Sequence, residues 1–260
     1  MTFPIIYATG LMFPFVTRTD NPIVGKCQWD EKREHDGRCV YCYAQGPKGI
    51  AVQKNMPLYK GPPRLNEKVL RKSLKPNDFL FPSMRDWFNP NMSVELRVPA
   101  YAWIRKYAPV KALILTKNPK GLYEDLAEDL VPRNCVVGAT IEADVDYPQL
   151  SGAPPQTERL EYMRMIHSDF PEYKTFVSAE PVLRFTTDFP EKIKDVGPWA
   201  TAVGYDSRKC MLPEPLLPNT EWLIGELSWF TTVYVKKLRQ AWWDRGQLLK
   251  ALQRLSGNDR

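Results

Sequence analysis

The chain has 260 residues, of which 43% are hydrophobic and 25% are charged, an ordinary composition for one large α/β domain. No continuous apolar run approaches the ~20 residues that a membrane span requires. Residues 1–15 lack the basic start and the small-residue cleavage site of a signal peptide. We therefore expect a cytoplasmic protein with no membrane segment, in which the five cysteines are thiols or metal ligands rather than disulfides.

Charge is distributed unevenly along the chain. The formal net charge is +6, but residues 48–75 carry a net +7, residues 232–260 a net +5 and residues 121–195 a net −8. A molecule with a basic side suits an anionic partner, so nucleic acid is a candidate partner. Solvated helix faces with ordinary surface charge would give the same counts.

Short apolar segments alternate with helical patterns. The candidate strands are residues 13–16, 78–83, 111–116, 135–141, 174–179, 199–203 and 231–235. The candidate helices are residues 65–74, 94–108, 120–130, 157–170 and 220–230, and Pro99 is expected to kink or split the second of them. The strands are apolar almost throughout, as in parallel strands covered on both faces. The alternation therefore predicts an α/β fold with a parallel sheet, open or closed into a barrel.

No internal repeat, low-complexity tract or linker divides the sequence, so we expect one domain over residues 1–260. Residues 43–64 lack a clear period and are expected to form a long loop. Residues 237–260 are expected to form a basic helical extension. Trp242 and Trp243 within it are candidates either to stack on bases or to seal the end of the barrel.

Polar residues directly follow five of the predicted strands. They are Ser83 and Asp86, Thr116 and Lys117, Thr140 and Glu142, Ser178 and Glu180, and Tyr205 and Asp206. In parallel βα architectures the active site lies at the carboxyl ends of the strands. A single polar residue there can simply begin a loop, but five strand ends in succession predict a shared polar mouth.

Three of the five cysteines lie close together in the stretch CQWDEKREHDGRCVYCYAQ. Eleven residues separate Cys27 from Cys39, and two separate Cys39 from Cys42. A structural zinc site would need a fourth ligand, from His35, Cys135 or Cys210. A disulfide with a spare thiol is a second alternative. A third is a four-iron cluster held by three cysteines, which leaves one iron open to coordinate a small molecule.

The third alternative agrees with a family resemblance. The aromatic Tyr41 just before the last cysteine, within CVYCYA, resembles the radical S-adenosylmethionine (SAM) superfamily, and especially its spore-photoproduct-lyase-like branch and the phage- and mobile-element-associated three-cysteine-motif proteins. Motifs resembling that group follow in its order over residues 13–237. They are NPIVGKC, FLFPSMRDWF, LILTKNPKGL, VVGATIE, FVSAEPVL and AVGYDS. The resemblance implies a partial (β/α)6–7 TIM-like barrel of mostly parallel strands.

The sequence departs from that pattern at two places. The first cysteine interval is longer than the usual three residues, which leaves the geometry of the cluster loop 27–42 open. Gly204 is followed by Tyr205 where the group has paired glycines. A tyrosine there would narrow the pocket or reach the substrate.

The resemblance implies an enzyme that holds a [4Fe–4S] cluster through Cys27, Cys39 and Cys42. With an electron from a donor such as flavodoxin or ferredoxin, such an enzyme cleaves SAM to a 5′-deoxyadenosyl radical that abstracts hydrogen from a substrate. The basic segments favour a nucleic acid or nucleotide substrate, for repair or modification. Two alternatives remain: the same chemistry on a peptide or small metabolite, and a zinc-stabilised nucleic-acid-binding protein without catalysis.

Roles for the polar residues follow from the resemblance and from charge. Tyr41 is expected to lie against adenine. Ser83 and Asp86 are candidates for the SAM amino group, and Lys117 for its carboxylate or an anionic part of the substrate. Thr140 and Glu142 are candidates for the ribose hydroxyls, and Ser178 for a further cofactor contact.

Three residues near the later strands are catalytic candidates. Glu180 faces the sulfonium or the substrate, and Tyr205 is a candidate to contact the substrate. Cys210 is a candidate to return a hydrogen atom to a substrate radical or to bind a second cluster, although a lone cysteine is more often a small buried apolar residue. Cys135 and His167 are expected to be structural.

Overall fold

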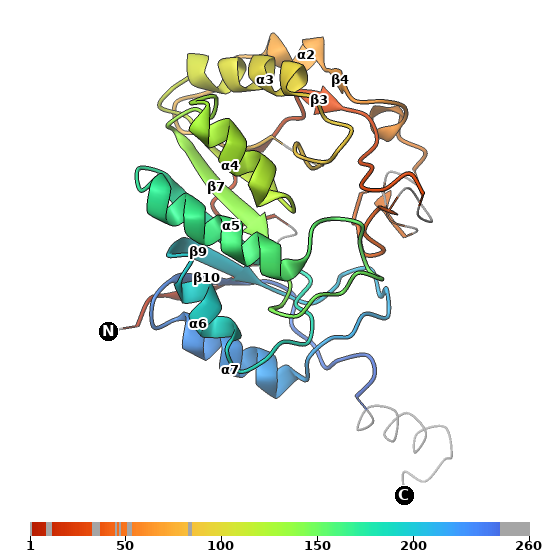
Figure 1. Ribbon diagram of the computed structural model, residues 1–260, viewed down its shortest axis with the longest axis vertical. Coiled ribbons are helices and arrows are strands. Elements are labelled where there is room, and N and C mark those ends of the chain that lie inside the picture. The colour runs from red at the N-terminus through yellow and green to blue at the C-terminus, as the bar shows by residue number, and fades with distance from the viewer. Residues whose placement is uncertain are drawn as a thin grey trace, which may run out of the picture.

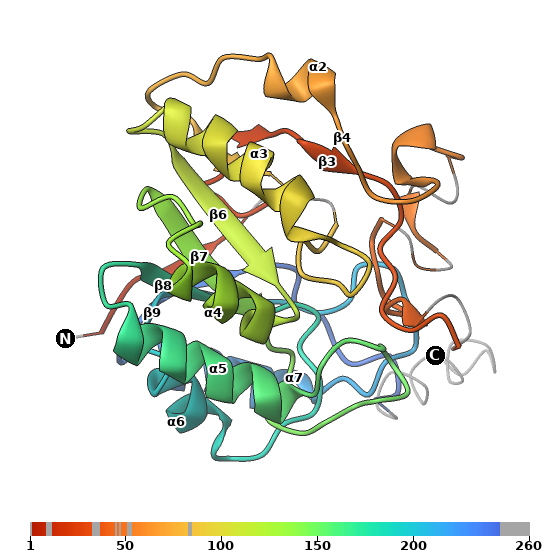
Figure 2. The same ribbon diagram turned by 45° about the horizontal axis from the view of Figure 1, so that its top comes forward.

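Eight parallel strands form a single sheet in the order β1-β10-β9-β8-β7-β6-β5-β2. The computed structural model describes residues 2–8, 12–32, 37–44, 46, 48–50, 54–82 and 85–244. The sheet curls into a half-barrel, and helices pack along its outer face (Figures 1 and 2). The predicted partial TIM-like barrel is therefore confirmed, with every strand pair of this sheet parallel.

The central strands lie where the apolar runs predicted them. The sheet contains β1 (Ile5–Tyr7), β2 (Arg18–Thr19), β5 (Phe79–Phe81), β6 (Lys111–Thr116), β7 (Cys135–Thr140), β8 (Lys174–Ala179), β9 (Pro198–Val203) and β10 (Thr232–Val235). All six residues of β7 are buried, because the curl covers one face and helices cover the other. A separate antiparallel pair joins β3 (Ile23–Val24) to β4 (Arg64–Leu65).

The helices follow the strands in βα order. They are α2 (Glu67–Leu70), α3 (Val94–Lys106), α4 (Pro119–Ala127), α5 (Gln156–Asp169), α6 (Phe189–Lys194) and α7 (Leu217–Leu227). Pro99 was expected to kink or split its helix; it does not split it, because α3 runs through it as one helix, and the kink stays a prediction. In the described part of the predicted loop 43–64, Pro57–Tyr59 forms a short 3-10 helix.

The predicted strand 13–16 is not a strand. Its apolar side chains instead fill the inside of the curl, where Phe13 lies 5.0 Å from the ring of Phe176 and Phe15 lies 4.8 Å from that of Phe79. Pro14 between them has no N–H to give to a strand ladder. A continuous apolar run therefore marks burial here, whereas the strand that pairs with β5 is the polar pair Arg18–Thr19.

The C-terminal segment is irregular as far as the structure describes it. Residues 237–244 contain no helix, and the remainder of the predicted extension 237–260 lies outside the described residues. Arg239 forms a bidentate ion pair with the buried carboxylate of Glu214, at 2.5 and 2.7 Å. The indole N–H groups of Trp242 and Trp243 donate to the carbonyls of Leu212 and Glu214, so both rings fasten this segment to the loop after β9.

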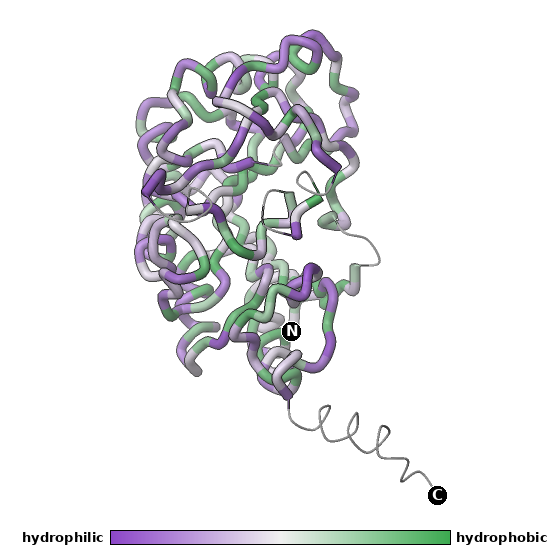
Figure 3. Tube along the Cα trace, turned by 90° about the vertical axis from the view of Figure 1, so that its right-hand side faces the viewer, coloured by the Kyte–Doolittle hydropathy of each residue, from purple (hydrophilic) through white to green (hydrophobic). Residues whose placement is uncertain are grey.

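Hydrophilic stretches mark much of the periphery in Figure 3, and hydrophobic stretches run mainly through the interior. Across the residues that are described, no helix combines the length and the apolar character needed to cross a lipid bilayer.

Candidate functional site

The loops that follow the strands gather at one end of the half-barrel, as Figure 2 shows for the loop beyond the arrowhead of β6. The cysteine-containing segment lies across this end. Tyr41 bonds to Glu142 after β7, and Cys39 and Cys42 pack with Ala143 and Leu183 from the loops after β7 and β8. Residues far apart in the sequence therefore share the predicted mouth.

The three clustered cysteines are thiols that lie within electrostatic reach of one another. All five cysteines of the chain are outside disulfides. Burial raises the pKa of Cys27 well above its ordinary value, and Asp86, Cys39 and Cys42 raise it further. Burial also raises the pKa of Cys39, to which Ser151 lies within hydrogen-bond distance at 3.1 Å. Such thiols are costly to ionise unless a cation or metal compensates for the charge.

The three cysteines of this loop are the candidate metal ligands of the site. Within the described ranges, no group of three or more His, Cys, Asp and Glu side chains is arranged to hold one metal ion. Each protein ligand of a four-iron cluster binds a different iron, so its sulfurs need not converge on one point. Cys27, Cys39 and Cys42 influence one another electrostatically, and a cluster held by them stays a prediction. His35, the local alternative ligand for zinc, lies outside the described residues.

Glu142 is the centre of a buried charge network. Its side chain is fully buried, and one carboxylate oxygen accepts hydrogen bonds from the Tyr41 hydroxyl and the Lys117 ammonium. The other accepts from Gln156 at 2.5 Å and Arg159 at 2.7 Å. Burial opposes its ionisation, but Lys117 and Arg159 outweigh burial and lower the pKa of Glu142 to about 2. The carboxylate is thus held ionised by two cations.

Lys117 joins this network to the cluster loop. Its ammonium lies 5.0 Å from the centroid of the Tyr41 ring, a cation–π contact. Burial and the neighbouring Glu142 raise the pKa of Tyr41 well above its ordinary value, so the hydroxyl stays a hydrogen-bond donor. Lys117, predicted to contact the SAM carboxylate, and Glu142, predicted to contact the ribose, therefore contact each other and Tyr41.

Asp86 is held by three protein donors after β5. It accepts hydrogen bonds from the Thr116 hydroxyl and the Lys117 backbone N–H, both at 2.6 Å, and from the backbone N–H of Phe88 at 2.9 Å. Burial raises the pKa of Asp86, and these hydrogen bonds oppose the rise. The carboxylate is fixed beside Cys27 and Lys117. Ser83, its predicted companion, lies outside the described residues.

Ser178, near the end of β8, and Glu180, just beyond it, continue the mouth. Both Thr140 and Ser178 are buried at the ends of their strands. Glu180 Oε1 lies 3.7 Å from the ammonium of Lys236, which follows β10. Burial raises the pKa of Glu180, and Lys236 opposes the rise. Lys236 therefore adds a second cation to the mouth that the strand-end residues alone did not include.

Gly204 follows β9, where a missing side chain leaves room for Glu180 and Lys236. A Cβ at this position would lie 2.7 Å from the Lys236 Cβ and 3.2 Å from Glu180 Oε1. Gly204→Ala is therefore expected to displace Lys236 and to lower the free energy of unfolding by about 1–3 kcal/mol in chemical denaturation. Gly225→Ala in α7 is the matched control, since no described atom lies within 4 Å of its Cβ position and alanine favours a helix. Equal losses in both variants would contradict the steric argument.

Tyr205 packs away from the charged groups of the mouth. Its hydroxyl donates to the carbonyl of Pro215 at 3.1 Å and lies 2.8 Å from the Thr220 hydroxyl of α7. The ring is buried and sits beneath the guanidinium of Arg239, at 5.3 Å. These contacts give Tyr205 a packing role between the loop after β9 and α7, and its predicted contact with a substrate stays a prediction.

Cys210 lies in the same apolar cluster as Cys39 and Cys42, together with Leu183 and Leu212. Its backbone N–H donates to the Asp206 carboxylate at 2.5 Å. Burial and the Asp206 charge raise the pKa of the Cys210 thiol to about 11. The sulfur therefore keeps its hydrogen at neutral pH, which a hydrogen-atom donor requires.

The pKa of Cys210 predicts slow alkylation. At pH 8 iodoacetamide should modify it more than about 100-fold more slowly than free cysteine, because only the thiolate reacts. The rate should keep rising until about pH 11, and Asp206→Asn should shift the profile to lower pH. Mass spectrometry of the labelled peptide measures this. A half-maximal rate near the ordinary thiol pKa would contradict the burial of this sulfur.

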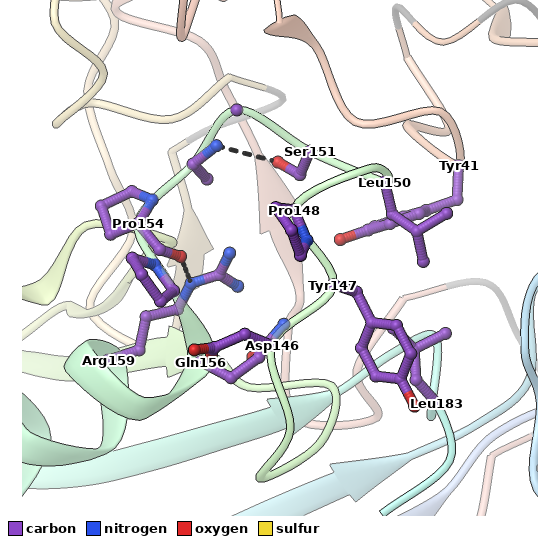
Figure 4. Close-up of a pocket in the computed structure, with 13 residues that line it drawn as sticks. Tyr41, Asp146, Tyr147, Pro148, Leu150, Ser151, Pro154, Gln156, Arg159 and Leu183 are labelled. Atoms are coloured by element: carbon purple, nitrogen blue, oxygen red, sulfur yellow. Dashed lines mark hydrogen bonds between the residues drawn. The ribbon is translucent and has the colours of Figure 1, made fainter.

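A cavity of about 320 Å³ adjoins the Glu142 network. Tyr41, Gln156 and Arg159 line it together with Tyr147 and Leu183. Figure 4 shows the tyrosine rings and Leu183 on one side and Arg159 and Gln156 on the other. The cavity combines flat apolar walls with hydrogen-bonding groups, as small-molecule sites do.

Sequence reasoning missed Gln156 and Arg159. Both lie in the first turns of α5 rather than at a strand end, so the strand-end rule could not identify them. The sequence shows only an ordinary pattern of helix charges at Glu158, Arg159 and Glu161. Arg159 differs from the other two because it is buried. No protein-family model matches this chain, and no curated protein matches it either.

Proposed function

We propose that the protein is a radical SAM enzyme whose [4Fe–4S] cluster is held by Cys27, Cys39 and Cys42. The observation that carries the proposal is the location of these three thiols. Cys39 and Cys42 pack against the loops after β7 and β8, beside the Glu142 network, and Cys27 lies within electrostatic reach of both and of Asp86. In parallel βα folds this end carries the chemistry.

When bound, the cluster would supply the open iron that binds SAM and the electron that cleaves it. The chain's own residues would position SAM and exclude water. Val40, Leu183 and Leu212 pack around the thiols, and this apolar shell keeps solvent from the reacting centre. Tyr41 is held by Glu142 and Lys117, so its ring is fixed beside the cavity before any ligand arrives.

The polar residues of the mouth divide by charge. Asp86, Glu180 and the fully buried Glu142 are the carboxylates, and Lys117 and Lys236 are the cations that face them. We propose that Asp86 and Ser83 hold the amino group of SAM and that Lys117 contacts its carboxylate, with Thr140 and Ser178 as further contacts. Glu180 and Cys210 would face the substrate, and Cys210 would supply a hydrogen atom.

Nucleic acid is the proposed substrate class. The Lys48 ammonium donates to the Lys209 carbonyl at 2.5 Å, and Arg208 donates to the Tyr43 carbonyl at 3.5 Å. The exposed Lys48 and Lys209 and the partly buried Arg208 therefore lie near Cys42 and Cys210, with the half-exposed ring of Tyr43 among them. Phosphates and an unstacked base are the partners that such a rim suits. Binding of an oligonucleotide that barely changes with salt would favour a peptide or metabolite substrate instead.

The experiment that tests the enzyme class is anaerobic. The protein is reconstituted with iron and sulfide, reduced with dithionite or with flavodoxin, and mixed with SAM. We expect about four irons per chain and the release of 5′-deoxyadenosine, detected by mass spectrometry. Purified protein that contains zinc, takes up no sulfide and unfolds on chelation would reject the proposal.

A further inference from the structure

Arg85 holds the chain at the entry to the first cysteine. It follows β5 and is 5% exposed. Its guanidinium donates from Nη1 to the Val24 carbonyl at 3.1 Å and from Nη2 to the Lys26 carbonyl at 2.7 Å. One planar side chain thus fixes the peptide groups 24–25 and 26–27 on the approach to Cys27.

The turn between these carbonyls admits only a glycine. Gly25 has φ +117°, which side chains rarely tolerate, and a Cβ there would lie 2.3 Å from the Pro62 carbonyl oxygen and 2.9 Å from Arg85 Nη1. The backbone amides on either side of the turn pair with residues 58 and 61. The approach of the chain to Cys27 is therefore set from both sides, by segment 58–62 and by Arg85.

Arg85 also places a positive charge next to the proposed cluster. Its guanidinium lies within electrostatic reach of Cys27, of the Asp86 carboxylate and of a second cation, Arg64. A cluster bound by three thiolates becomes more negative when it accepts an electron. A buried cation nearby stabilises that reduced form more than it would in water, because the local dielectric constant is low. Net charge and hydrogen bonding around the ligands are what tune the reduction potentials of such clusters.

We propose that Arg85 is a positioning residue that fixes the first cluster ligand and stabilises the reduced cluster by its charge. This inference rests on the proposed function, because it needs a cluster at Cys27. It goes beyond that function by assigning to one buried side chain both the loading of the cluster and the ease of its reduction.

Two substitutions of Arg85 test the positioning role and the electrostatic role separately. Arg85→Lys keeps the charge but cannot span both carbonyls, whereas Arg85→Gln keeps a hydrogen-bond donor and loses the charge. Arg97→Gln is the matched control: Arg97 is also a largely buried arginine, with 12% of its side chain exposed, but it pairs with Asp125 of α4. Iron and sulfide per chain are counted after anaerobic reconstitution, and the midpoint potential is measured by a redox titration followed by electron paramagnetic resonance.

In Arg85→Gln we expect the equilibrium constant for one-electron reduction to fall about tenfold, which is about 59 mV. Arg85→Lys should keep most of the potential but load at least about twofold less iron. Arg97→Gln should match the wild type in both measurements. A midpoint potential in Arg85→Gln equal to that of the wild type overturns the electrostatic role.

Folding is checked by circular dichroism. Should Arg85→Gln fail to fold, Arg85→Lys decides, since full iron loading in that variant contradicts the positioning role. A wild-type protein that takes up no iron and sulfide would instead reject the proposed function itself. A loaded wild type with identical loading and potential in both Arg85 variants rejects this inference alone.

Discussion

Replacing Cys27, Cys39 and Cys42 with alanine is expected to abolish uptake of iron and sulfide and the release of 5′-deoxyadenosine. Each single substitution should lower cluster content and nucleoside release more than about 100-fold, because a cluster that already lacks a fourth protein ligand tolerates no further loss. The measurements are iron and sulfide per chain, the visible absorbance of the reconstituted protein and mass spectrometry of the nucleoside.

Two other cysteines supply the controls. Cys135→Ala removes a thiol buried in β7 of the barrel core, so it should cost stability but leave the cluster intact. Cys210→Ala should keep both the cluster and the cleavage of SAM, because in the proposed mechanism hydrogen return would follow cleavage. Nucleoside release that persists in the triple variant would show that these three thiols are not the ligands.

The fold could be predicted from apolar runs because those runs lie in the buried centre of the sheet. Strands β6 and β8 begin and end at the predicted residues. Apart from residues 13–16, which fill the inside of the curl, two other errors concern short segments outside the centre of the sheet. Strand β1 has three exposed residues and exists because it pairs with β10. The predicted helix 65–74 begins only at Glu67 because Arg64–Leu65 pairs with β3. Pairing with a strand that is distant in the sequence determines whether such a short segment forms a strand, and its local residue pattern does not.

The candidate site was predictable where it depends on strand order and not where it depends on side-chain direction. The strand-end rule identified Asp86, Lys117 and Glu142, which the structure connects through Lys117. It also identified Tyr205, whose hydroxyl in fact bonds to α7. Residues that follow a strand often carry polar atoms, and only the fold determines which of these side chains face the mouth.

Loss of the Glu142 charge is expected to destabilise the fold as well as the site. Glu142→Gln leaves Lys117 and the 2% exposed Arg159 without their carboxylate. Breaking a buried ion pair by removing one partner costs about 3–5 kcal/mol, because an uncompensated charge stays buried. Chemical denaturation at pH 7 measures the loss, with exposed Glu191→Gln, whose partner Lys194 is also exposed, as the control at under about 1 kcal/mol.

The same network predicts how stability depends on pH. The pKa of Glu142 falls from 4.5 to about 2 on folding, so its contribution is present in full above about pH 4.5 and is lost as the pH falls toward 2. The lowered pKa corresponds to about 3 kcal/mol at neutral pH. The stability difference between wild type and Glu142→Gln should therefore shrink between pH 5 and pH 2.5.

A double variant tests whether the cost comes from the stranded cations. Lys117→Met alone removes one of the two cations that hold Glu142, and Lys117→Met with Glu142→Gln removes a charge of each sign. Because the two side chains are in direct contact, their effects should not add, and the double variant should be less destabilised than the sum of the single losses. Two results would show that Lys117 and Arg159 do not hold the Glu142 carboxylate ionised. One is strictly additive losses, and the other is a pH profile of stability that is identical in wild type and Glu142→Gln. Tyr41 would then need another anchor, since its hydroxyl donates to that carboxylate.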